Sequence, residues 1–116
     1  MTVSIQSLPG YQYKYAMMTT DLIIQSLREQ DPRREFTEDD FKDIRNLNMS
    51  NKNICTISNL ADFSLLTKLD ISNNAIERLE CLDLLVNLEV LDASFNRLTS
   101  IEGIENLVHL TDLNLN

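Results

Sequence analysis

The chain has 116 residues, of which 43% are hydrophobic and 24% charged; this composition is typical of one globular domain and excludes collagen-like and low-complexity classes. The formal net charge of -8 disfavours direct binding to nucleic acid, because an acidic surface repels phosphate groups. No run of apolar residues approaches the roughly 20 that a membrane span needs, so we expect no membrane partner.

The first residues are polar and include Tyr11, Tyr13 and Tyr15. Their alternation could form a strand, but a lone strand is only marginally stable and chain termini are often poorly held. We therefore predict a disordered extension over residues 1–19. It lacks the basic start and long apolar stretch of a secretory signal, and we expect the protein in the cytoplasm.

A helix is predicted over Leu22–Gln30, with Leu22, Ile23 and Leu27 on one side. Thr20 or Asp21 can cap its first turn, since both residue types accept hydrogen bonds from free backbone N–H groups. The pair Asp31-Pro32 ends the helix, because a residue before proline avoids helical geometry.

A second short helix is predicted to begin at Thr37. Asp40 follows three residues later, as in a capping box. Phe41 and Ile44 should point toward the residues that follow. We therefore interpret residues 20–43 as a helical cap over the apolar end of a repeat array.

A 22-residue repeat begins at Ile44 and gives three full rows and a truncated fourth over residues 44–116. Its clearest apolar columns are Ile44, Leu66, Leu88, Leu110; then Leu47, Leu69, Leu91, Leu113; then Met49, Ile71, Ala93, Leu115. Each row follows L-x-x-L-x-L-x-x-N-x-L, in which the L-x-L step alternates as a short strand does. No row can bury its apolar residues alone, so we expect the rows to stack.

One polar column contains Lys52, Asn74 and Asn96. An inward asparagine both donates and accepts, so Asn74 and Asn96 should form a structural ladder that satisfies backbone groups. Lysine cannot accept a hydrogen bond. We therefore expect Lys52 to interrupt the ladder and to extend its ammonium group into solvent.

Another column contains Asn59, Cys81 and Gly103. Asparagine and glycine tolerate positive φ, so this column predicts a left-handed turn, which suits Cys81 less well. The segments between strands are short enough for a single helical turn, with 3-10 geometry favoured.

The fourth row stops at Leu115-Asn116, before its asparagine position. Leu110, Leu113 and Leu115 should then present an uncovered apolar edge. We interpret the chain as a piece of a longer solenoid and expect it to be marginally stable alone.

Two segments, LTKLDISNNAIERLE (66–80) and LEVLDASFNRLTSIEGIENL (88–107), resemble the short leucine-rich-repeat class, which includes a nuclear regulatory subunit of phosphatase 1 and many ciliary proteins. The resemblance covers residues 44–116. It implies an α/β leucine-rich-repeat solenoid with short parallel strands on the concave face, 3-10 or short helical turns on the convex face, and an N-terminal helical cap.

A narrower resemblance includes DLIIQSLREQ (21–30) and FKDIRNLNMSNKNICTISNL (41–60). These segments are similar to the leucine-rich-repeat subunits of the nexin–dynein regulatory complex of motile cilia. That resemblance implies a scaffold of the axoneme and cytoskeleton that helps to control dynein. The family continues into more repeats and a long coiled coil, which this chain lacks.

Strand residues that face away from the core should line the concave face and bind a protein partner. The candidates are Asn46, Asn48, Lys68, Asp70, Ser72, Val90, Asp92, Ser94, Phe95 and Asp112. Stacked Asp70 and Asp92 favour a basic partner, the alternative being that they are merely solvated. Phe95 could anchor a partner, but packing against the neighbouring row is the favoured interpretation.

No catalytic or metal site is expected. Asp70 and Asp92 lack a nearby nucleophile or histidine, so an acid–base pair is unsupported. His109 stands alone on the convex side, and Cys55 and Cys81 lie in different columns. We expect no cofactor and no small-molecule substrate.

The function that these observations favour is a non-catalytic protein–protein scaffold, with axonemal or dynein-regulatory subunits as partners. Two alternatives remain open: a phosphatase-regulatory scaffold and a spliceosomal RNA-associated scaffold. The acidic charge disfavours direct RNA contact in the second alternative.

Overall fold

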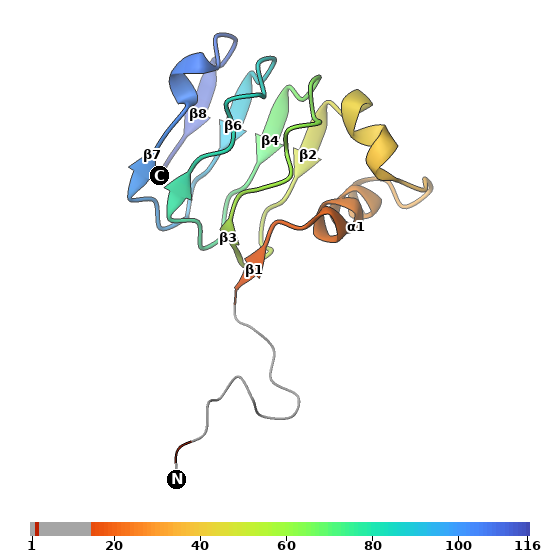
Figure 1. Ribbon diagram of the computed structural model, residues 1–116, viewed down its shortest axis with the longest axis horizontal. Coiled ribbons are helices and arrows are strands. Elements are labelled where there is room, and N and C mark those ends of the chain that lie inside the picture. Colours follow the sequence, from red (N-terminus) through yellow and green to blue (C-terminus); the bar gives the residue numbers. More distant parts are fainter. Residues whose placement is uncertain (1, 3–14) are drawn as a thin grey trace.

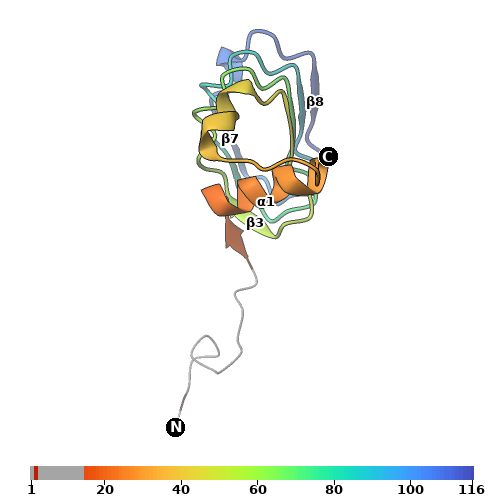
Figure 2. The same ribbon diagram turned by 90° about the vertical axis from the view of Figure 1, so that its right-hand side faces the viewer.

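The computed structural model describes residue 2 and residues 15–116. Each 22-residue row makes one turn of a coil, and the rows lie side by side to form a curved array (Figures 1 and 2). The disorder predicted for residues 1 and 3–14 lies outside the described residues.

A four-stranded parallel sheet forms the concave face of this array. Its strands are β2 (Asn46–Asn48), β4 (Lys68–Asp70), β6 (Val90–Asp92) and β8 (Asp112–Asn114), and they neighbour one another in chain order. The register is 22 residues at every step, so that Leu47, Leu69, Leu91 and Leu113 are aligned. The predicted column Leu47, Leu69, Leu91, Leu113 is therefore confirmed as one aligned position of neighbouring strands.

Smaller strands and turns form the opposite side. β5 (Arg78–Leu79) pairs in parallel with β7 (Ser100–Ile101), and η3 (Ile104–Asn106) is a single 3-10 turn. Asn59, Cys81 and Gly103 all have positive φ, at 61°, 61° and 75°. The left-handed turn predicted for this column is therefore confirmed, and Cys81 adopts it as well.

The array begins earlier than the sequence predicted. Ala16–Met17 forms β1, which pairs in parallel with β3 (Ile54–Thr56), and the Ala16 N–H donates to the Asn53 carbonyl at 2.7 Å. Met18 is fully buried. Residues 16–19 therefore do not belong to a disordered extension, because backbone pairing and burial of Met18 hold them against the first row.

Helix α1 (Thr20–Gln30) is capped by Thr19, not by Thr20 or Asp21 as predicted. The Thr19 hydroxyl accepts a hydrogen bond from the Leu22 N–H at 3.2 Å. Thr19 has the extended backbone that an N-cap requires, whereas Thr20 is already helical. Ile23 and Leu27 are buried, so the predicted apolar side of the helix does face the first row.

The second predicted helix is the 3-10 helix η2 (Glu38–Asp43). The Asp40 carboxylate accepts a hydrogen bond from the Thr37 N–H at 2.9 Å and pairs with Arg34 at 3.0 Å. This backbone hydrogen bond is the main cause that lowers the Asp40 pKa, with Arg34 adding to the effect and desolvation opposing it. Phe41 stacks on Phe63 of the first row, their ring centroids 4.5 Å apart.

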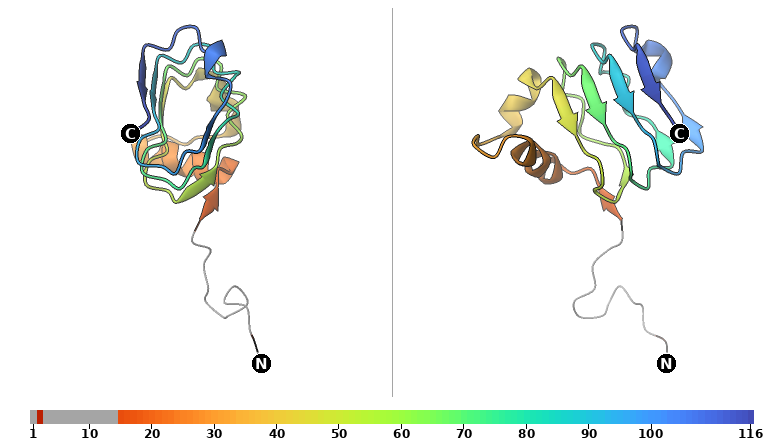
Figure 3. Two further views of the ribbon diagram at one scale, coloured as in Figure 1. Left: turned by 90° about the vertical axis from the view of Figure 1, so that its left-hand side faces the viewer. Right: turned by 180° about the vertical axis from the view of Figure 1, so that it is seen from behind.

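Lys52 does not extend into solvent as predicted. Its ammonium group forms an ion pair with Glu29 of α1, and its side chain is only 18% exposed. Helix α1 lies beside the first row (Figure 3). It supplies the Glu29 carboxylate, so that the Lys52 cation joins the cap to the first row.

The core lies between the sheet and the outer turns and contains the repeated apolar columns. Leu69, Ile71, Leu79, Leu82 and Leu88 are completely buried. At the other end of the array, Leu113 and Leu115 are 42% and 36% exposed, as predicted for an uncovered edge, whereas Leu110 is half-buried and packs against the core. The fold is thus a stack of rows whose concave strands hold the candidate site.

Candidate functional site

The concave face presents a regular set of outward side chains. Strand pairing aligns Lys68 with Val90, and Asp70 with Asp92. Aligned residues in neighbouring strands lie roughly 5 Å apart. Asp112 extends the acidic character to β8, where it aligns with Val90 and is exposed.

Asp70 and Asp92 also have a structural function that the sequence analysis missed. The Asp70 carboxylate accepts hydrogen bonds from the N–H and the hydroxyl of Ser72, at 2.9 and 2.6 Å. The Asp92 carboxylate accepts the same pair from Ser94, at 3.0 and 2.6 Å. The recurrence of Asp-x-Ser at a 22-residue spacing was the signal that could have predicted these turns.

Ser72 and Ser94 are therefore not available to a partner, and their assignment to the concave surface was wrong. They are 5% and 3% exposed, because each hydroxyl turns back to the aspartate two residues earlier. The same geometry recurs at Asn48, whose side chain accepts from both the N–H and the hydroxyl of Ser50.

The predicted asparagine ladder is present beneath this face. The Asn74 side chain accepts from the N–H groups of Lys52 and Ile54, at 2.9 and 3.1 Å. Its amide donates to the carbonyls of Met49, Ile71 and Ser72. One row later, Asn96 accepts from the Ile76 N–H and donates to three carbonyls in the same way. Asn74 and Asn96 thus hold the ends of the strands.

Phe95 is exposed, and within these 116 residues it does not pack against a neighbouring row as the favoured prediction expected. Its exposed fraction is 68% and its φ is +55°. Asn51 and Asn73, at the equivalent positions of earlier rows, have φ of 57° and 55°. Phe95 thus occupies a left-handed position that suits asparagine, which directs an aromatic ring outward at the end of β6.

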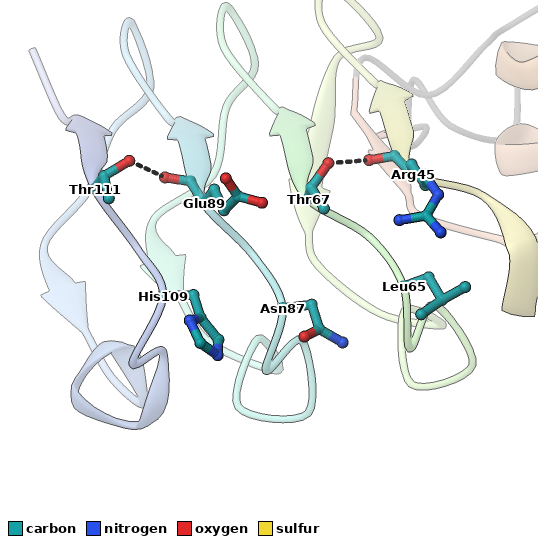
Figure 4. A pocket seen from close by; sticks show the side chains of 7 residues that line it. All are labelled: Arg45, Leu65, Thr67, Asn87, Glu89, His109 and Thr111. Atoms are coloured by element: carbon teal, nitrogen blue, oxygen red, sulfur yellow. Dashed lines mark hydrogen bonds between the residues drawn. The ribbon is translucent and has the colours of Figure 1, made fainter.

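A shallow groove of about 530 Å³ runs across the rows where the concave strands begin. Its lining includes Arg45, Asn87, Glu89 and His109 (Figure 4). The hydroxyls of two threonines in the groove donate to backbone carbonyls of the preceding row: Thr67 to Arg45, and Thr111 to Glu89. His109 forms no hydrogen bond with Glu89 in the part of the chain that the structure describes, and the hydroxyls of both threonines are directed to backbone carbonyls.

The thiols lie outside this groove. Cys55 and Cys81 are both free, and burial raises the pKa of the Cys81 thiol, helped by Glu80, Asp83 and Glu102. Among residues 2 and 15–116, no three His, Cys, Asp or Glu side chains come together in a way that could hold a metal ion. Within the same residues, no helix is both long and apolar enough to cross a membrane.

The stacked rows, the parallel strands and the asparagine ladder define a leucine-rich-repeat solenoid. Residues 86–116 match the sequence model of the family described as Leucine Rich repeats (2 copies), which supports the leucine-rich-repeat class. No curated protein matches the chain. Repeats of this class generally mediate protein–protein interaction.

Proposed function

We propose that this chain is a non-catalytic scaffold of the ciliary or flagellar axoneme, similar to dynein regulatory complex subunit 3. Its partners would be other axonemal or dynein-regulatory subunits. The observation that supports a binding function most directly is Phe95, which combines a left-handed backbone with 68% exposure beside the concave strands.

Contacts between two parts of the chain support the narrower resemblance. The segments that carry it, 21–30 and 41–60, lie against each other in the structure. Gln30 forms hydrogen bonds with the backbone of Asn46 and Asn48, and Glu29 pairs with Lys52. The similar segments therefore form one structural unit, as expected if the resemblance concerns a whole cap and first repeat.

The charges of the concave face favour a basic partner segment. Asp70, Asp92 and Asp112 lie on three successive strands, and Lys68 is the cation among them. Asp70 and Asp92 are half-buried, so a part of each side chain remains accessible although each accepts hydrogen bonds from a serine. An aromatic residue beside carboxylates suits an arginine, whose planar cation can stack on the ring while it pairs with an acid.

Localisation in a flagellated cell tests the proposal. The tagged chain, and a version extended through more repeats, would be expressed and the membranes removed with detergent. We expect at least the extended version to remain on the axoneme. Replacement of Phe95 by asparagine should release it, since asparagine keeps the backbone geometry and removes the ring.

The contrary result is equally clear. If both versions wash into the soluble fraction while a phosphatase catalytic subunit or a splicing factor co-purifies, the axonemal proposal fails. That outcome would favour one of the two alternative scaffold functions.

A further inference from the structure

Leu84, Val86 and Val108 are three exposed aliphatic side chains whose exposure the stacking of rows does not explain. Ile101, Leu113 and Leu115 are exposed because they belong to apolar columns and face the uncovered end of the array. Leu84, Val86 and Val108 belong to no such apolar column. Their side chains are exposed on the turns that lead back to the sheet. This set, here called the turn patch, consists of Leu84 (58% exposed), Val86 (47%) and Val108 (77%).

The repeat places these side chains together. Val86 and Val108 differ by 22 residues and so occupy the same position in adjacent rows. Leu84 lies two residues before Val86 in the same turn, which the buried neighbours Leu82 and Leu85 attach to the core. These turns line the edge of the array from which the concave strands begin (Figures 1 and 3).

The first row shows that the fold does not require apolar residues here. The positions that correspond to Leu84 and Val86 are occupied by Asp62 and Ser64, both of which are exposed. The backbone of the turn is nevertheless equivalent, because Phe63 donates to the Leu60 carbonyl as Leu85 donates to that of Leu82. The aliphatic side chains are therefore an addition in the second and third rows, without a structural need.

The rim of the turn patch is acidic. Residues 80–87 and 102–109 contain four acidic residues and neither lysine nor arginine. Arg78 pairs with Glu80 and Glu102, whereas Asp83 and Glu105 have no ion pair among the described residues. Asp83 and Glu105 are exposed and again occupy one position in adjacent rows, so two like charges lie beside the aliphatic side chains.

We propose that the turn patch binds a basic amphipathic segment of a partner protein. Aliphatic side chains of that segment would pack on Leu84, Val86 and Val108, and its lysines or arginines would pair with Asp83 and Glu105. A second copy of this chain is disfavoured as the occupant, since two molecules of net charge -8 repel each other. The surface is separate from the concave face, so this inference goes beyond the proposed function and does not depend on it.

A titration followed by NMR tests the inference. The probe is a synthetic helical peptide made only of leucine and lysine at amphipathic spacing, added to the isotope-labelled full chain. We expect the amide signals of residues 83–88 and 105–109 to shift. Replacing Leu84, Val86 and Val108 by serine, the residue that the first row has at position 64, should weaken binding by about tenfold or more.

A matched control uses the exposed ring on the other face. Phe95→Asn removes an equally exposed apolar side chain, and binding of the peptide should be unchanged. A leucine–glutamate peptide should bind at least about tenfold more weakly than the leucine–lysine peptide. If the triple serine variant fails to fold, Asp83→Asn with Glu105→Gln tests the rim alone and should weaken binding several-fold.

Three outcomes would overturn the inference. The first is a set of shifts centred on the concave strands. The second is unchanged affinity in folded variants of the turn patch or of its rim. The third is a shift of the turn-patch signals with protein concentration alone, which would identify a second copy as the occupant.

Discussion

The Gln30 side chain pairs with the backbone of Asn48 as a neighbouring strand would. Its carbonyl accepts the Asn48 N–H at 2.7 Å, and its amide nitrogen donates to the Asn46 carbonyl at 3.1 Å. Strand β2 is the first strand of the sheet, and its outer edge would otherwise present these groups to solvent or to another chain. The Gln30 side chain therefore satisfies two backbone groups at the outer edge of β2.

Replacing Gln30 by alanine should destabilise the chain by about 1 kcal/mol, because two backbone hydrogen bonds are exchanged for bonds to water at an exposed position. Urea unfolding, followed by circular dichroism, measures the change. Gln25→Ala is the matched control, since Gln25 is exposed on the same helix. Equal midpoints for the two variants would show that the pairing contributes nothing.

The asparagine ladder should be much more sensitive. Asn74→Ala removes five hydrogen bonds to backbone groups in a half-buried position, although the carbonyls of Ile71 and Ser72 still accept from Asn96 and Asn51. We expect a loss of about 2–3 kcal/mol in the free energy of unfolding. Asn87→Ala provides the comparison, because Asn87 makes one exposed hydrogen bond, to the Ser64 carbonyl. A loss as small as that of the control would mean that water replaces Asn74 at no cost.

Phe95→Asn should stabilise the chain by roughly 1 kcal/mol while it weakens capture of a partner. The stabilisation follows from the φ of +55°, a region that asparagine tolerates better than phenylalanine. The reverse exchange, Asn73→Phe, places a ring at the equivalent position and should destabilise by a similar amount. Thermal denaturation measures whether the stability rises in Phe95→Asn and falls in Asn73→Phe. A fall in stability for Phe95→Asn would show that the ring packs in solution.

Asp40 should make part of the stability dependent on pH. The hydrogen bond from Thr37 lowers its pKa in the folded chain, so the unfolded chain binds a proton first as the pH falls. This contribution is present above the usual aspartate pKa of about 3.9 and is lost as the pH falls through the lower folded value. Unfolding midpoints of Asp40→Asn and the unchanged chain should therefore differ at pH 7, and the difference should shrink as the pH falls below the usual aspartate pKa.

The neighbouring Asp39 supplies the control for this experiment. Asp39 is exposed and lies in the same turn of η2. Asp39→Asn should follow the pH dependence of the unchanged chain. If the unfolding midpoint of Asp39→Asn also differs from that of the unchanged chain at pH 7 and approaches it at low pH, the effect comes from the overall charge of the turn and not from the hydrogen bond.

The strands and the core could be predicted because they follow directly from the repeat. Leu47, Leu69 and Leu91 recur at 22 residues, and a residue in an apolar column can be buried only if the rows stack. The asparagine ladder and the left-handed column were predictable for a similar reason. In each case the chemistry of the residue type matched a position that the repeat had already fixed.

Contacts between different elements could not be predicted in this way. Gln30 and Lys52 depend on how closely α1 approaches the first row, which no periodicity encodes. Ser72 and Ser94 were assigned to the surface because alternation along a strand predicts outward side chains. Alternation says nothing about a hydroxyl that turns back to its own chain.

The constant register has a consequence for how such a chain can change in length. Thr67 donates to Arg45, Thr111 donates to Glu89, and Asn74 accepts from Lys52, each across 22 residues. A duplicate of residues 66–87, inserted after Asn87, would meet the same donors and acceptors on both sides. An insertion of any other length within the sheet would displace all of them together. Whole rows are therefore the unit in which this protein can be lengthened or shortened, by recombination or by design, without a new set of contacts.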